Sequence, residues 1–75
     1  MNNTRRKSIQ NIISRIEEAK DNLETLLDEE QDYLDNMPEN LQESLRAESA
    51  QEAIDNMETA VNSLEECIDS LSEVC

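Results

Sequence analysis

The chain of 75 residues has no glycine, histidine, tryptophan or phenylalanine, and only one proline and one tyrosine. Without glycine it has few ways to form tight turns at positive φ, which argues against β-hairpins and glycine-rich phosphate loops. Without histidine it lacks the usual general base, the usual catalytic triads and imidazole metal ligands. These absences favour an all-α protein that is not an enzyme and holds no cofactor.

Basic residues are also scarce: six Lys and Arg stand against 19 Asp and Glu, for a formal charge of −13. Residues 1–20 carry five of the six basic side chains and two acids, a net +3. Residues 21–75 carry 17 acids and one base, Arg46, a net −16. Such a surface repels nucleic acid and anionic membranes, which bind proteins through clustered cations. It favours a basic protein surface as the partner.

Long apolar runs are missing as well. None reaches the roughly 18–20 residues of a membrane span, and the polar N-terminus does not resemble a signal peptide. Cys67 and Cys75 stand eight residues apart on one expected helix, about 12 Å at 1.5 Å per residue, which is too far for a disulfide within the chain. We therefore expect a reducing, cytoplasmic location. Whether Cys75 cross-links two chains under oxidation stays open.

What the sequence does contain is a repeated apolar pattern with alternating steps of three and four residues, typical of an amphipathic helix. In the first half, heptad positions a are Ile9, Ile16, Leu23 and Glu30; positions d are Ile12, Ala19, Leu26 and Tyr33; positions e are Ile13, Lys20, Leu27 and Leu34. The pattern predicts a helix over about residues 4–36, with Thr4 as its N-cap. Pro38 should end it and open a bend over about residues 37–43.

The second half repeats every seven residues. Positions a are Ala50, Met57, Leu64 and Leu71; positions d are Ala53, Ala60, Cys67 and Val74; positions e are Ile54, Val61, Ile68 and Cys75. This predicts a second helix over about residues 44–74. Ser44 or Ser49 could cap it, and we favour a start near Ser44 because good helix formers follow it.

The two helices predict a single domain over residues 1–75, an antiparallel, coiled-coil-like hairpin in which opposed residue numbers sum to about 83. Positions a and d are expected to fill the seam between the helices. The apolar e positions are then surplus, because a two-helix hairpin cannot bury three apolar positions per heptad. We expect them to form a homo-oligomer, plausibly a helical bundle, or to enter a groove on a partner. These residues are Ile13, Leu27, Ile54, Val61 and Ile68.

Acidic residues recur three or four apart on both helices, where neighbouring carboxylates lie about 5–6 Å from one another, near the spacing of successive phosphates. The candidate partner-binding acids are Asp21, Glu24, Asp28, Asp32 and Asp35 on the first helix, and Glu52, Asp55, Glu58, Glu65, Glu66 and Asp69 on the second. A calcium loop needs a glycine turn and converging oxygens, whereas acids along a helix diverge. No metal site is predicted.

The segment EEQDYLDNMPENLQES (Glu29–Ser44), followed by a helix rich in Ala, Ile, Leu and Glu, resembles one in uncharacterised small acidic helical proteins of bacteriophages and integrated mobile elements. The similarity runs from Leu27 to the end of the chain, and NMPENLQ is its most specific part. It implies a phage-type origin and action in a bacterial host. Many small acidic phage proteins inhibit host defence, some as DNA mimics that occupy the cationic channels of restriction or CRISPR nucleases.

The leading hypothesis is therefore a non-enzymatic interaction protein that binds a basic host protein through its acidic helical faces, as an anti-CRISPR or anti-restriction inhibitor does. The alternative is a structural coiled-coil oligomerisation module that acts through its apolar faces. An antitoxin or chaperone-like cap for a basic protein would show the same electrostatics as the first. Salt separates the two main hypotheses, because it weakens binding to a basic partner and barely weakens apolar self-assembly.

Overall fold

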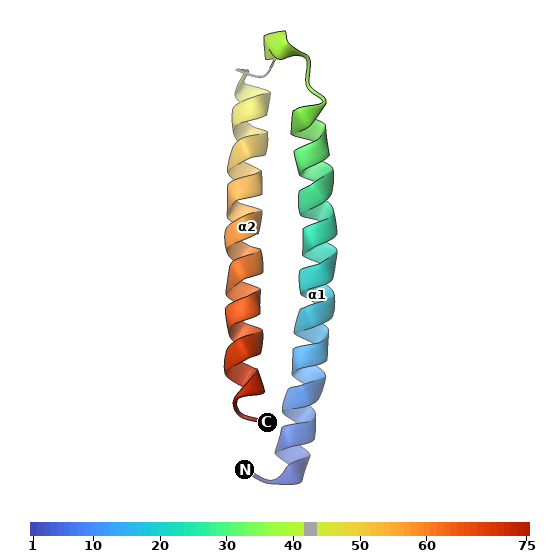
Figure 1. Ribbon diagram of the computed structural model, residues 1–75, viewed down its shortest axis with the longest axis vertical. Coiled ribbons are helices and arrows are strands. Elements are labelled where there is room, and N and C mark those ends of the chain that lie inside the picture. The colour runs from blue at the N-terminus through green and yellow to red at the C-terminus, as the bar shows by residue number, and fades with distance from the viewer. Residues whose placement is uncertain (42–43) are drawn as a thin grey trace.

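The computed structural model describes residues 1–41 and 44–75. Its two long helices are α1 (Asn3–Asp35) and α2 (Leu45–Ser72), and the short 3-10 helix η1 (Glu39–Leu41) lies between them. The helices run antiparallel, side by side, and bring both termini to one end (Figure 1). The predicted all-α hairpin is confirmed. Gln42 and Glu43, the last two residues of the expected bend, lie outside the described residues.

Helix α1 is continuous because residues 1–37 contain neither glycine nor proline. Its N-cap is Asn2, whose side-chain oxygen accepts a hydrogen bond from the backbone N–H of Arg5 at 2.8 Å. The prediction of Thr4 as N-cap is wrong by one half-turn, because Asn2 already has the extended backbone that a cap needs, whereas Thr4 lies within the first turn.

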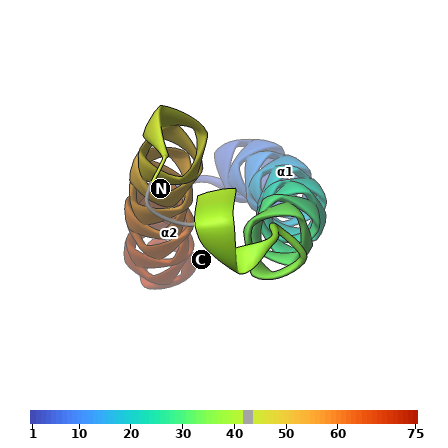
Figure 2. The same ribbon diagram turned by 90° about the horizontal axis from the view of Figure 1, so that it is seen from above.

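The bend follows from Pro38, as predicted. The helix stops at Asp35, and the side chain of Asn36 turns back to donate a hydrogen bond to the carbonyl of Asp32 at 2.8 Å. Pro38 then opens η1, where the N–H of Leu41 bonds to the Pro38 carbonyl at 2.8 Å. Figure 2 shows this segment crossing over the end of the hairpin.

Helix α2 begins as predicted, with Ser44 as its N-cap. The Ser44 hydroxyl accepts a hydrogen bond from the N–H of Ala47 at 3.3 Å and donates one to the carbonyl of Leu41. One side chain therefore joins η1 to α2. The helix ends at Ser72, two residues before the predicted end.

The seam is formed by positions a and e, and the prediction that a and d would form it is wrong. Ile54 and Val61, both at e, are 1% and 9% exposed, and Ala47 and Ala50 are 3% exposed. The other e positions Ile13, Leu27, Leu34 and Ile68 are half-buried beside a positions such as Leu23 and Leu64. Met37 is also buried at the bend, so Met37, Ala47, Ala50 and Ile54 place most of the buried side chains toward that end.

Positions d lie outside the seam. Ile12, Leu26, Tyr33 and Val74 are 40–55% exposed, and Ala60 and Cys67 are also exposed. The physical reason lies in α2, whose d residues are mostly Ala and Cys while its e residues are mainly Ile and Val. Turning e inward removes more apolar area from water than turning d inward would. Each Å² of apolar area buried stabilises the fold by about 25 cal/mol.

The register agrees with the predicted sum of about 83. Lys20 pairs with Glu65, a sum of 85, and the thiol of Cys75 lies 3.7 Å from the carbonyl of Arg6, a sum of 81. In the part of the chain that the structure describes, neither helix has a stretch apolar and long enough to cross a membrane.

Candidate protein-binding surface

The seam gives the hairpin two different sides. With a and e turned toward the other helix, the 100° step per residue places b and f on one side and d and g on the other, with c pointing outward. Antiparallel pairing then puts the b and f positions of both helices on the same side. Each helix therefore contributes its b and f side chains to one side of the hairpin and its d and g side chains to the other.

The b and f side is lined by acids. Three shallow grooves follow the seam there and are lined from both helices. We call the nine acids that line them the acidic groove: Glu17, Asp21, Glu24, Asp28 and Asp35 from α1, and Glu48, Glu58, Glu65 and Asp69 from α2. Asp55 occupies an f position of the same side.

The structure thus places seven of the eleven predicted acids along the three grooves of one side, and it separates others from them. Asp32, Glu52 and Glu66 occupy position c, and each is exposed on the outer surface of its helix. Sequence reasoning missed Glu17 and Glu48, which line the groove. The signal for them was their b and f positions, which became informative only when the seam was known.

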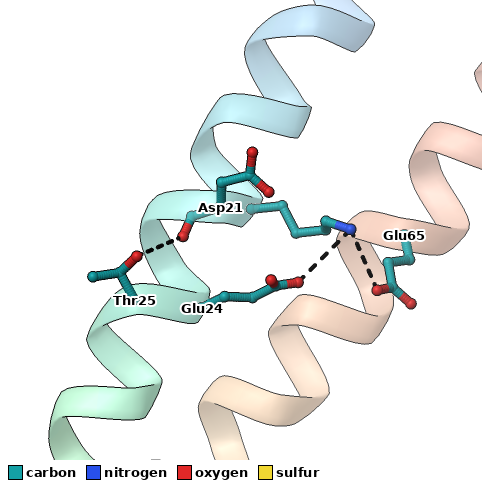
Figure 3. Close-up of polar contacts among 5 residues, drawn as sticks. Asp21, Glu24, Thr25 and Glu65 are labelled. Carbon is teal, nitrogen blue, oxygen red and sulfur yellow. Dashed lines mark hydrogen bonds and ion pairs between the residues drawn. The ribbon is translucent and has the colours of Figure 1, made fainter.

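Lys20 lies among the acids that line the acidic groove. It occupies an e position, half-buried in the seam, and its ammonium lies 3.4 Å from a Glu65 oxygen and 3.7 Å from a Glu24 oxygen (Figure 3). Partial burial acts to lower its pKa, but the hydrogen bond to Glu65 and the negative charges of Glu65, Glu24 and Asp21 outweigh it. The pKa of Lys20 is therefore raised above its ordinary value.

The five residues predicted as an exposed apolar surface for oligomers or partners lie in the seam. Ile54 and Val61 are buried, so the interpretation of these two as an exposed surface is wrong. Ile13, Leu27 and Ile68 are half-buried beside them. The apolar side chains that remain accessible are those at d.

The three grooves are lined mainly by carboxylates and apolar side chains. Within residues 1–41 and 44–75, no cluster of acids and cysteines converges closely enough to hold a metal ion. Cys67 and Cys75 are free, exposed thiols. Comparison of the chain with known protein families, curated proteins and solved structures finds no match.

Proposed function

We propose that this protein binds a basic protein surface through the acidic groove and has no catalytic activity of its own. The observation that carries the proposal is the alignment of nine carboxylates from two helices along three successive shallow grooves on one side of the hairpin, with Lys20 as the cation beside them. A complementary cationic surface would gain from long-range attraction during encounter and from ion pairs after docking.

The charge density of this side is close to that of a nucleic acid strand. Counting Asp55, ten carboxylates lie along the stretch from Glu48 to Asp69 and the part of α1 opposite it, a length of about 32 Å at 1.5 Å per residue. That is about one charge every 3 Å, compared with about 3.4 Å between the phosphates of one DNA strand. The partner we propose is accordingly a nucleic-acid-binding protein.

The scaffold supports this function because it holds the acids in place. All ten lie within two continuous helices, so their backbone positions are fixed before binding. Binding then orders only side chains, at a cost of about 0.5–1.5 kcal/mol for each one immobilised. The proposal includes the host setting implied by the resemblance: a phage-type inhibitor of a defence nuclease that acts in the bacterial cytoplasm.

The test uses two variants that each lose five charges. The groove variant replaces Asp21, Glu24, Asp28, Glu58 and Glu65 by Asn or Gln, whereas the outer variant replaces the exposed position-c acids Glu18, Asp32, Glu52, Glu66 and Glu73. Proteins captured from a bacterial extract are identified by mass spectrometry, and each purified partner is titrated with both variants at low and high salt. Duplex DNA is added as a competitor.

We expect the groove variant to lose affinity for the partner by about tenfold or more, and to lose most of the salt dependence of binding. The outer variant should keep most of its affinity, because its acids face away from the groove. DNA should compete with the wild type. Equal losses in the two variants would show that net charge alone drives binding. Full retention of affinity by the groove variant would refute the proposal.

A further inference from the structure

The side opposite the acidic groove exposes apolar side chains at d and carries few acids. Between Ser8 and Asn36 of α1 and between Ser49 and Val74 of α2, its d positions present Ile12, Ala19, Leu26, Tyr33, Ala53, Ala60, Cys67 and Val74, and its g positions present Ser8, Arg15, Asn22, Glu29, Asn36, Ser49, Asn56, Ser63 and Ser70. We call these residues the apolar face. Leu26 is 55% exposed, and Ile12 and Tyr33 are each 47% exposed, so the hairpin leaves its largest α1 side chains at d in water.

Charge makes this face unlike the rest of the surface. Among the described residues of the apolar face, Glu29 is the only acid and Arg15 the only base, although the chain carries a net −13; Arg5 and Arg46 occupy the next d positions, at the N-terminal end of each helix. Two copies approaching through their acidic grooves would repel one another. Two copies approaching through the apolar face keep their acidic grooves on opposite outer surfaces, where the like charges are farthest apart.

We propose that the apolar face binds the apolar face of a second copy, with a two-fold axis that sets α1 antiparallel to the second α1. In this arrangement, opposed α1 residue numbers sum to about 44–45. Arg15 then faces Glu29 of the second copy, and the symmetry repeats this pair. Leu26 faces Ala19 of the second copy, which pairs a large side chain with a small one, and Ile12 faces Tyr33.

The second helix fits the same axis. The axis crosses α1 near Asn22. Because Lys20 of α1 pairs with Glu65 of α2, opposed residue numbers within one hairpin sum to about 85 at this level, and Asn22 lies beside Ser63. A two-fold axis near Ser63 makes opposed α2 residue numbers sum to about 127. Ala60 then faces Cys67 of the second copy, and Ala53 faces Val74. The centre of the α2 contact carries small side chains, which lets two helices approach closely.

The size of the face approaches that of a standard protein interface. The hairpin is 15 Å wide, and the apolar face extends over 28 residue steps of α1, about 42 Å at 1.5 Å per residue. Its footprint is roughly 600 Å² before the relief of the side chains is counted, compared with about 800 Å² per partner in a standard interface. The product is a four-helix bundle in which neighbouring helices are antiparallel. Residues at d become part of its core.

The first test measures mass in solution by sedimentation equilibrium over a range of concentrations. The wild type should reach twice its monomer mass of 8.6 kDa. Leu26→Glu should raise the dimer dissociation constant by about tenfold or more, because it buries a charge in the contact. The matched control Thr25→Glu adds the same charge one residue away, at the exposed position c, and should leave the dimer largely intact. A wild type that stays monomeric, or equal losses in both variants, would overturn the proposal.

The second test uses the Arg15–Glu29 pair. Arg15→Glu places two acids opposite one another, and Glu29→Arg places two bases opposite one another. Each single variant should weaken the dimer, by roughly threefold to tenfold. The double variant R15E/E29R restores opposite charges and should dimerise nearly as well as the wild type. Additive losses in the double variant would refute the antiparallel α1 pairing.

The third test distinguishes this arrangement from one that packs α1 on the second copy's α2. In a C75S background, where Cys67 is the remaining native thiol, A60C should form intermolecular disulfides rapidly under mild oxidation, because Ala60 faces Cys67 of the second copy. A19C is the control, since Ala19 would face Cys67 only in the other arrangement. Faster cross-linking of A19C than of A60C would overturn the proposed geometry.

Discussion

Lys20 of α1 and Glu65 of α2 are joined across the seam by an ion pair of 3.4 Å, the only ion pair between the helices among the described residues. Lys20 stands where the heptad pattern would have an apolar residue. Its aliphatic stem lies along the seam while its ammonium reaches the acidic groove. The pair therefore helps to fix the position of α1 along α2, and it also places a positive charge beside the acids of the groove.

The raised pKa of Lys20 makes the stability of the hairpin depend on pH in the alkaline range. A lysine whose pKa is raised on folding stabilises the folded state fully below the unfolded pKa of about 10.4, and this contribution is lost as the pH rises through the folded pKa. We expect urea unfolding to show a loss of stability as the pH rises above about 10.4, and this loss should be smaller in Lys20→Met. Lys7→Met, at an exposed position near the start of α1, is the control and should keep the wild-type profile.

The seam assignment predicts which truncations destabilise the hairpin. Ile54→Ala removes a side chain that is 1% exposed, and it should lower the free energy of unfolding by about 2–4 kcal/mol. Glu52→Ala, on the outer surface, should change it by no more than about 0.5 kcal/mol. Leu23→Ala and Leu64→Ala, at half-buried a positions, should also cost about 2–4 kcal/mol. Thermal or urea unfolding measures each value, and a negligible effect of Ile54→Ala would contradict the seam of positions a and e.

The cap at Ser44 predicts a local effect on α2. Ser44→Ala removes the acceptor for the N–H of Ala47 and the hydrogen bond to η1, and it should cost about 1 kcal/mol. Ser49 was the other candidate cap and lies inside the helix. Ser49→Ala should therefore be neutral or slightly stabilising, because alanine has the higher helix propensity. If the two variants destabilised equally, the cap assignment would fail.

Salt should act in opposite directions on the two sides of the hairpin. Binding of poly-L-lysine, a simple cationic probe, should weaken as salt rises, because screening reduces attraction at the acidic groove. Self-association through the apolar face should strengthen with salt, because screening reduces repulsion between two copies of charge −13. Calorimetric titration measures the first and sedimentation the second. A dimer that dissociates with rising salt would indicate that its contact is electrostatic.

Much of the fold could be predicted because local patterns specify it. The absence of glycine, the position of Pro38 and the cap at Ser44 set where the helices begin and end, through backbone sterics and hydrogen bonding that act over a few residues. The sum of opposed residue numbers followed from the length of the bend. Local patterns do not specify how the bend packs: Leu41 and Leu45, apolar residues on either side of it, are 43% and 81% exposed.

The candidate site was only partly predictable. The sequence by itself determined that acids avoid positions d and a almost entirely, and hence that each helix has one acidic side. It did not determine which acids face the same groove, because positions a, d and e are all apolar and either a with d or a with e can form a seam. Choosing the seam rotates each helix enough to move Asp32 and Glu52 outward and Glu17 and Glu48 into the groove.

Only the tertiary structure decided between the two seams. Ile54 and Val61 bury more apolar area against α1 than Ala53 and Ala60 would, so α2 turns its e positions inward, and α1 follows although this brings Lys20 into the seam. Lys20 is tolerated because Glu65 stands opposite it on the other helix. That pairing joins residues 45 positions apart, which no local pattern within one helix contains.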